Sequence, residues 1–574
     1  MKSLTGRHAR ITFRLGLAFL VAGLAAAAPA APLFKRWVYD GANFLVAEQV
    51  TAKIAELERF AAEGYNGVVI SDYKFMRWDD MPASYTANIR RYREATRRLK
   101  MEVVAAVMPL GYSNALLGHD PNLAEGLPVK QAPFVVRHGR LVPDDDGPAL
   151  QNGGFEQGHD NKPAGWSFVD DPGRITFIDS AVKHEGRASL RMQDVLANEP
   201  TSKHARACQT LAVKPFRYYH VSVWARTQGW DGGDTRVAVI GGDGASLNFH
   251  MPSLEPTEDW KRVDIAFNSL DNTRVNLYLG TWDGGHGTIW WDDVRLEPGG
   301  FVNVLRRPGT PLVITSEDGA TTYEEGRDFS AIRDPKLGND PWNGEYSAWH
   351  EPPVVTVPEG SRMKGGQRVL ADYYHTAIIY DGQVPCCMSE PKVYELLAWQ
   401  AQHVRDALAP DAYMMNHDEI RIQGWDKSCA DRHLTCGEIL ADNVRRCTDI
   451  LHKADPGKPI WVWSDMFDPN HNAAKSGRYY LVKGDGPWYN SWKGLPAEVG
   501  ILNWNMGPKT RRASMEHFAR LGHRQVLAGY YDGNPAAIAD WLKAGEGVNG
   551  VDGVMYTTWR NDYHATKAFI DASK

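Results

Sequence analysis

The sequence predicts an α/β chain built on a (β/α)8 TIM barrel that is interrupted after its third strand by two β-rich domains. Three observations predict this fold class. Short apolar strands alternate with amphipathic helices between Arg36 and Asn114, and the same alternation resumes near Arg368. The residues between these segments have the two-residue period of antiparallel strands. The two alternating segments together supply roughly eight strands, the number that closes such a barrel.

Residues 1–30 have the pattern of a secretory signal peptide. An apolar stretch at 15–28 ends in the small-residue site Ala28-Pro29-Ala30, and it is preceded by the basic residues Lys2, Arg7, Arg10 and Arg14. The alternative is a membrane anchor, but about 20 apolar residues are needed to span a bilayer comfortably. We therefore expect a cleaved signal peptide and a secreted or periplasmic protein without stable membrane insertion.

The composition excludes some partners. A net charge of -6 and a pI near 6.4 leave no basic footprint, so nucleic acid is not an expected partner. The 20 Trp and 23 Tyr suit stacking on sugar faces as well as core packing. Six cysteines are too few for a disulfide framework, although Cys429 and Cys436 flank a short loop and could pair. No Cys or His spacing predicts zinc.

Residues 31–148 are predicted to form the first part of the barrel, with strands at 37–40, 67–72 and 103–108. One helix follows the first strand, because apolar residues recur there at helical spacing, namely Val50, Ile54, Leu57 and Phe60. A second helix is expected at 89–99.

Residues 149–298 have the strand pattern of a β-sandwich, with period-two segments at 219–224, 236–239 and 275–279. The segment resembles the jelly-roll carbohydrate-binding-module superfamily in three motifs: Asn152-Gly153-Gly154-Phe155-Glu156 followed by Gly165-Trp166, then Ala188-Ser189-Leu190-Arg191, then Trp291-Asp292-Asp293-Val294-Arg295-Leu296. The resemblance implies a structural Ca²⁺ with Glu156 and Asp293 as candidate ligands, since carboxylate oxygens suit calcium. Ordinary surface positions for both carboxylates are the alternative. Many such modules bind sugar, and others only brace a catalytic domain.

The rest of the chain is divided in two. Residues 299–367 are predicted to form a small β-rich domain, with strands at 311–315 and 353–357 and no recognisable chemistry. Residues 368–574 are predicted to complete the barrel, with helices at 391–408 and 436–452 and strands at 412–416, 460–464, 499–504, 525–530 and 553–557. The second helix starts with a capping box, Thr435 and Glu438.

Carboxylates and aromatic side chains follow almost every predicted barrel strand, at the ends where such barrels build active sites. They are Asp40, Asp72, Asp418-Glu419, Trp463 with Asp465, Trp504 with Asn505, Tyr530-Tyr531-Asp532, and Trp559 with Asp562. For a single Asp the simpler interpretation is a helix cap. The repetition favours a glycosidase site, in which an acid protonates the leaving oxygen while rings hold the sugar.

From Pro385 to Ile420 the chain resembles the family 20 glycoside hydrolases, the β-N-acetylhexosaminidases. The family has a helix that starts with proline, then a linker, then a strand that ends in His-x-Gly-Gly-Asp-Glu. This chain has Ser389-Glu390-Pro391-Lys392-Val393-Tyr394-Glu395, then Leu408-Ala409-Pro410-Asp411-Ala412-Tyr413, then Asn416-His417-Asp418-Glu419. The later strand ends follow the family order, with Trp463, Trp504, Tyr530-Tyr531-Asp532 and Trp559.

The resemblance implies a role for each of these residues. Glu419 would be the general acid and then the general base, and Asp418 would orient the substrate's 2-acetamido group, which attacks the anomeric carbon. Tyr530 would donate to the acetamido oxygen and Asp532 would bind a ring hydroxyl. Further substrate-binding candidates are His417, Trp463, Asp465, Trp504, Trp559, Asp72 and Asp40.

The chain departs from the family pattern at three places. Asn416-His417 replaces the two glycines, and Asn561 stands where the family has glutamate after Trp559. The family's first-strand arginine has no clear counterpart, and Arg421 or Arg560 could substitute for it.

The sequence thus predicts a secreted, exo-acting hydrolase of β-linked GlcNAc or GalNAc that acts by substrate-assisted retaining catalysis without a cofactor. Its partner would be an oligo- or polysaccharide. One alternative is a conventional two-carboxylate glycosidase for sugars without an acetamido group, with Asp465, Asp532 or Asp562 as nucleophile or base. The other is a non-catalytic polysaccharide-binding protein.

Overall fold

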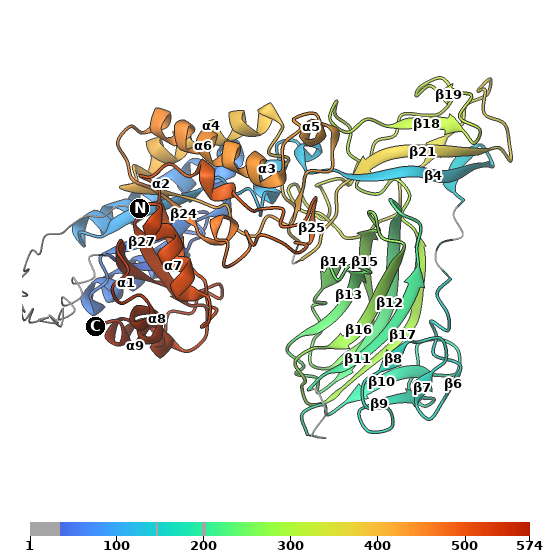
Figure 1. The fold of residues 1–574 in the computed structure, drawn as a ribbon, viewed down its shortest axis with the longest axis horizontal. Helices are drawn as coiled ribbons and strands as arrows, with labels where there is room; N and C mark the ends of the chain where they lie inside the picture. Colours follow the sequence, from blue (N-terminus) through green and yellow to red (C-terminus); the bar gives the residue numbers. More distant parts are fainter. Residues whose placement is uncertain (1–34, 145–146, 148, 198–202, 381) are drawn as a thin grey trace, which may run out of the picture. The chain divides into compact units, whose positions relative to one another are not determined.

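The computed structural model describes residues 35–574 except 145–146, 148, 198–202 and 381 (Figure 1). The predicted signal peptide, residues 1–30, lies outside the described residues. Among the helices of the described part, none is both long enough and apolar enough to cross a membrane.

Eight parallel strands form a closed barrel, and neighbours around the barrel follow one another in chain order. They are β1(Lys35–Gly41), β2(Gly67–Ser71), β3(Glu102–Val107), β22(Ala412–Met415), β24(Ile460–Trp463), β26(Gly500–Asn503), β27(Gln525–Tyr530) and β28(Val551–Thr557). Because strand side chains alternate in direction, Trp37 and Tyr39 of β1 pack inside the barrel while Val38 packs outside it. The interior is filled by large side chains, and the rings of Trp37 and Trp461 meet edge to face at 5.1 Å.

The helices of the described residues differ greatly in length. They are α1(Ala47–Glu63), α2(Ala83–Arg98), α3(Asn114–Leu117), α4(Pro391–Leu408), α5(Lys427–Ala430), α6(Cys436–Ala454), α7(Arg511–Arg520), α8(Ile538–Ala544) and α9(Thr566–Ala572). As the sequence predicts, α6 begins at a capping box in which Thr435 and Glu438 exchange backbone and side-chain hydrogen bonds.

The predicted fold class, an α/β chain on a (β/α)8 TIM barrel, is wrong. The helical fraction of the structure is only 23%, and most of its sheets are antiparallel. Between β24 and β26 the described chain holds the short 3-10 helices η4(Asp465–Phe467) and η5(Ser491–Gly494) and the strand β25(Leu481–Val482), with no α-helix. The apolar strands were visible in the sequence, but residues 464–499 do not have the helical period that a regular barrel would need there.

Two five-stranded antiparallel sheets share one hydrophobic core in the segment 168–298. One sheet has the order β15-β12-β17-β10-β9 and the other has β14-β13-β16-β11-β8. Their bounds are β8(Phe168–Val169), β9(Thr176–Asp179), β10(Ser189–Gln193), β11(Ala205–Ala212), β12(Tyr218–Gln228), β13(Thr235–Gly241), β14(Ser246–His250), β15(Glu258–Asn268), β16(Arg274–Thr281) and β17(Thr288–Pro298).

A six-stranded sheet joins segments that lie on either side of this sandwich in the sequence, in the order β19-β18-β21-β4-β5-β20. Its strands are β4(Leu127–Arg137), β5(Arg140–Pro143), β18(Val313–Ser316), β19(Thr322–Tyr323), β20(Val355–Thr356) and β21(Arg368–His375). The central pair, β4 and β21, is antiparallel. The chain therefore leaves the barrel after β3 and comes back through β21, which lies beside the strand by which it left.

Candidate active site

A cavity of about 1070 Å³ opens at the carboxyl ends of the barrel strands. Several aromatic side chains make its walls, namely Tyr39, Tyr112, Tyr380, Trp463, Trp504, Tyr531 and Trp559, and Trp342 is added from the segment between β19 and β20. Asp72, Asp418 and Glu419 also line it. The cavity therefore combines acidic groups with flat apolar surfaces.

Glu419 lies four residues beyond the end of β22 at Met415, and its side chain lines the cavity. Its φ of 46° is in the left-handed region, and its backbone N–H donates to Asp465 Oδ2 at 3.0 Å. Its side chain is 28% exposed and forms an ion pair of 2.8 Å with Arg421. The hydroxyl of Tyr112 donates to Glu419 Oε2 at 2.8 Å.

The loop that carries Tyr112 can approach Glu419 because of a glycine. A Cβ atom on Gly111 would lie 2.1 Å from the backbone oxygen of Asp418, closer than real Cβ atoms approach. Gln383 supports the same turn, because its Nε2 donates to the backbone oxygen of Glu419 at 2.7 Å. These contacts fix the position of the acidic pair at the cavity.

Three carboxyl groups lie together here, and we name Asp418, Glu419 and Asp465 the cavity cluster. Burial raises the pKa of Asp418 well above its usual value, and the negative charges of Asp465 and Glu419 raise it further. Burial also raises the pKa of Asp465. Burial opposes the charge of Arg421, but the negative charge of Glu419 outweighs this effect and raises the pKa of that guanidinium. The cavity cluster is thus crowded with negative charge, and Arg421 is paired with Glu419.

Asp465 is fixed by donors on three sides. Besides the N–H of Glu419, it accepts hydrogen bonds from Trp504 Nε1 at 3.1 Å and from Asn472 Nδ2 at 3.0 Å. It does not line the cavity, whereas Trp504 does. Asp465 therefore positions a wall of the cavity and one catalytic candidate at once.

Three tryptophans predicted at strand ends line the cavity. The rings of Trp463 and Trp559 have centroids 6.2 Å apart, and Tyr39 meets the edge of Trp559 at 5.2 Å. Trp504 lies 6.0 Å from Tyr531. Trp559 is 53% exposed, which leaves one of its faces open to a ligand.

Two predicted substrate-binding residues are buried away from the cavity. Asp40 is fully buried, forms an ion pair of 2.7 Å with Lys53 and accepts from the hydroxyl of Tyr92 at 2.6 Å. His417 is fully buried and its Nε2 pairs with Asn443 Oδ1 at 2.9 Å. Burial lowers the pKa of His417 to about 4, so it is a neutral core imidazole.

The predicted tyrosine is replaced by its neighbour. Tyr530 stacks on Tyr556 with centroids 4.2 Å apart and does not line the cavity, whereas Tyr531 does. Asp532 accepts from Thr558 Oγ1 and, at 2.9 Å, from the backbone N–H of Trp559. It therefore braces the loop that carries Trp559. Asp72 lines the cavity, but Lys74 neutralises its carboxylate at 2.7 Å.

Some cavity residues were not predicted. Tyr112 and Gln383 lie in irregular segments whose sequence has no period, so no local signal identifies them. Tyr39 could have been found, because it precedes Asp40 on the first strand and must point to the opposite side. Arg421 had been considered only as a substitute for an arginine on the first strand.

The structure places the two candidate calcium ligands against basic partners. Glu156 accepts from the backbone N–H of Arg187 at 2.7 Å and contacts that side chain at 3.3 Å. Asp293 pairs with Arg295 at 2.8 Å and also lies near His184 and Glu185. Calcium binding at this pair stays a prediction.

Comparison of the sequence with protein-family models finds no match, and comparison with curated proteins finds none either. Among solved structures, a rhamnosidase from Novosphingobium sp. PP1Y is 13% identical over 91% of this chain and 55% of its own, with a TM-score of 0.29. The Flavobacterium johnsoniae chitobiase is 15% identical over 34% of this chain and 30% of its own, with a TM-score of 0.23. The carbohydrate-binding module TmCBM61, solved with β-1,4-galactotriose, is 18% identical over 26% of this chain and 98% of its own, with a TM-score of 0.20. None of these similarities is high enough to assign a family.

Proposed function

We propose that this protein is a glycoside hydrolase. The observation that carries the proposal is the cavity cluster, of which Asp418 and Glu419 line an aromatic-walled cavity. Glycoside cleavage passes through a transition state with oxocarbenium character, whose positive charge a fixed group of carboxylates stabilises. Burial, together with the negative charges of Asp465 and Glu419, raises the pKa of Asp418, and the developing positive charge would favour its ionised form.

The proposed substrate is a terminal β-linked N-acetylhexosamine, cleaved by substrate-assisted retaining catalysis. Glu419 is accessible from the cavity and would act as general acid and then as general base. Asp418 would hold the 2-acetamido group, and its ionised form would stabilise the cationic ring formed when that group attacks the anomeric carbon. Because Tyr531 lines the cavity and Tyr530 does not, we assign the contact with the acetamido group to Tyr531; its hydroxyl is buried, so the ring would make this contact.

A second candidate is a two-carboxylate retaining glycosidase that uses Glu419 as the nucleophile. The observation that favours it is the ion pair of Glu419 with Arg421, together with the hydrogen bond from Tyr112. A carboxylate that attacks the anomeric carbon must be ionised, and a fixed guanidinium suits that state. Asp418, whose pKa burial raises well above its usual value, would then be the acid.

Hydrolysis of aryl glycosides tests the class and the sugar. Wild type, Glu419→Gln and the matched control Glu395→Gln would be assayed on aryl β-N-acetylhexosaminides, β-glucosides and β-galactosides. Glu395 is an exposed glutamate of α4 that pairs with Lys392 at 2.8 Å. We expect cleavage of the acetamido sugars by wild type and the control, and its loss in Glu419→Gln. Glycan binding without cleavage of any substrate would favour a non-catalytic binding protein.

The two mechanisms differ in their inhibitors. A thiazoline analogue of the cyclic intermediate should inhibit a substrate-assisted enzyme competitively. A 2-fluoro glycoside should instead label a nucleophilic Glu419 covalently, which peptide mass spectrometry would detect. Labelling of Glu419 would overturn the substrate-assisted assignment and leave the glycosidase proposal standing.

A further inference from the structure

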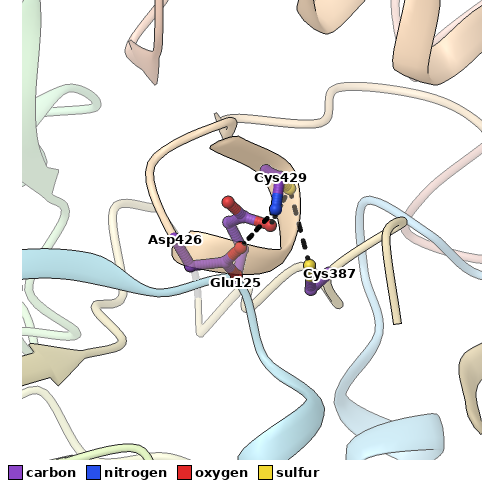
Figure 2. A group of neighbouring side chains, drawn as sticks. All are labelled: Glu125, Cys387, Asp426 and Cys429. Carbon is purple, nitrogen blue, oxygen red and sulfur yellow. Dashed lines mark hydrogen bonds between the residues drawn. The ribbon is translucent and has the colours of Figure 1, made fainter. Parts of the chain in front are cut away.

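Two carboxylates and two thiols meet in the core outside the active site (Figure 2). We name Glu125, Cys387, Asp426 and Cys429 the thiol cluster. Glu125, Cys387 and Asp426 are fully buried, and Cys429 is 2% exposed. One possible ligand atom from each residue lies within 4.8 Å of every other. The residues come from three separate segments of the chain, which the fold brings to one point.

The measured separations fit one central ion. The sulfur atoms of Cys387 and Cys429 are 3.6 Å apart, and Cys429 Sγ lies 3.5 Å from Glu125 Oε2. In a tetrahedral zinc site with the usual bond lengths, two sulfurs are ~3.8 Å apart and a sulfur and an oxygen are ~3.5 Å apart. The thiol cluster therefore has two edges of such a tetrahedron before any ion is placed in it.

One guanidinium, that of Arg307, is paired with the buried carboxylates of the thiol cluster. Carboxylates are almost never fully buried unless they are paired. In the described part of the chain, the ion pair found for these two carboxylates is that of Asp426 with Arg307 at 2.7 Å, and Arg307 is shared with Glu390 at 3.4 Å. A divalent cation would balance the buried negative charge and would stabilise the thiolate form of both cysteines.

The atoms that surround the thiol cluster orient its members as a second layer of ligands does in metal sites. Backbone N–H groups of Gly424 and Trp425 donate to Glu125 Oε1, at 2.8 and 3.2 Å. Gln423 Nε2 donates to Glu125 Oε2 at 3.2 Å and to Cys429 Sγ at 2.8 Å, which holds that oxygen on the side of the sulfur. The N–H of Cys429 holds Asp426 Oδ1 at 2.9 Å. Both carboxylates are thus fixed in orientation.

We propose that the thiol cluster binds one thiophilic divalent cation, with Zn²⁺ as the ion whose ligand types and geometry fit best. An ion there would tie Cys387, before α4, to Cys429 of α5 and its N-cap Asp426, and to Glu125. The segment before α5 begins just after Arg421, and the segment before α4 includes Gln383, which holds the backbone of Glu419. The ion would be a structural support behind the catalytic turn. This inference does not depend on the proposed glycosidase activity.

The cation would have an access route. Cys429 lines a second cavity of about 810 Å³, together with Cys436 and Gly424. The alternative state of the two thiols is a disulfide. It would require the sulfurs to move ~1.5 Å closer, and it would leave both carboxylates buried without a further cation.

Metal analysis of the reduced full-length protein tests the proposal. After incubation with Zn²⁺ and desalting, we expect about one metal ion per chain. Titration with Co²⁺ should produce the ultraviolet thiolate-to-cobalt band and the strong visible absorption of a tetrahedral site. Cys429→Ser should lose both signals, and the matched control Cys447→Ser, which removes another buried thiol, should keep them.

Three results would overturn the proposal. The first is wild-type protein with reduced thiols that binds neither ion. The second is an intact mass lower by two hydrogens with no bound metal, which would identify the disulfide. The third is metal retained by Cys429→Ser. Because the Co²⁺ titration uses wild type, it decides the question even if a variant fails to fold.

Discussion

The cavity cluster and the thiol cluster both crowd buried carboxyl groups, but they differ in access and in charge compensation. The cavity cluster faces a large opening between aromatic walls, and Glu419 keeps 28% of its side chain exposed. In the thiol cluster Glu125 and Asp426 are fully buried, and Cys429, which is 2% exposed, is the member that borders a second cavity. Crowded negative charge is useful where a transient positive charge can enter and leave. In a buried core the same charge needs a resident cation.

The largest expected effect is a loss of kcat when the cavity cluster is changed. Glu419→Gln should lower kcat by about 10³-fold, since general acid–base groups contribute roughly 10²- to 10⁴-fold. Cys429→Ser should leave kcat within about threefold at a temperature where the protein is folded, because it acts through stability and not through chemistry. Steady-state kinetics of both variants would measure this. Similar losses of kcat in the two would remove the distinction between the clusters.

The next largest effect concerns the buried carboxylate of Asp40, which forms an ion pair with Lys53. Asp40→Asn removes the fully buried partner of Lys53, which is 15% exposed and keeps Glu56 at 3.2 Å. We therefore expect a cost of about 3 kcal/mol in the free energy of unfolding, the low end for a broken buried pair. Asp406→Asn removes an exposed pair with Arg405 and should cost less than about 1 kcal/mol. Urea unfolding would compare the two. An equal loss of unfolding free energy in the two variants would mean that burial of Asp40 does not increase the contribution of its ion pair to stability.

A smaller effect depends on pH. Burial lowers the pKa of His417 to about 4, against about 6.5 in the unfolded chain. Above pH 6.5 the imidazole is neutral in both states, so its full contribution is present. As the pH falls toward 4 the unfolded chain takes up a proton that the folded chain refuses, and stability is lost by up to ~3 kcal/mol. His417→Gln should flatten the dependence of stability on pH between 7 and 4.5, and the exposed control His159→Gln should not.

The smallest expected effect concerns an aromatic wall. Trp559→Ala removes a half-exposed ring beside Tyr39 and should raise KM up to about tenfold with kcat little changed, since one ring contact is worth ~0.5–1.5 kcal/mol. The control Trp260→Ala lies on β15, far along the chain in the sandwich. Kinetics on the preferred aryl glycoside would measure the change. A fall in kcat without a change in KM would contradict a role in holding the sugar.

The sequence predicts the positions of strands and of their ends better than it predicts the direction in which the side chains at those ends point. The apolar runs identified all eight barrel strands, and the rule on strand ends led to Asp418 and Glu419. The rule failed at Asp40 and His417, because a residue at a strand end can point into the core as well as into the cavity. At Tyr530 the backbone φ is 84°, and Tyr531 follows with 48°. Two successive residues in the left-handed region change the direction of the backbone, so that Tyr531 and not Tyr530 faces the cavity. A periodic sequence pattern does not reveal such a change.

Contacts between distant segments were also hidden from the sequence. Glu125 and Cys387 are separated by most of the inserted β-rich chain, so the thiol cluster has no local spacing of the kind that predicts zinc. The pairing of β4 with β21 is equally non-local. The helical content was overestimated because strand count, which the sequence does indicate, does not require a helix after each strand.

Because the barrel is interrupted in the sequence, its fourth strand is synthesised long after its third. β3 ends at Val107 and its barrel neighbour β22 begins at Ala412, 305 positions later. At about 5–20 residues per second, the ribosome needs ~15–60 s to supply that partner. During this interval β3 has a free hydrogen-bonding edge, which is a template for pairing with other chains. Newly made chains would thus be most exposed to aggregation while the inserted β-strands are being synthesised, and a chaperone that covers the first three strands would have most effect in that interval.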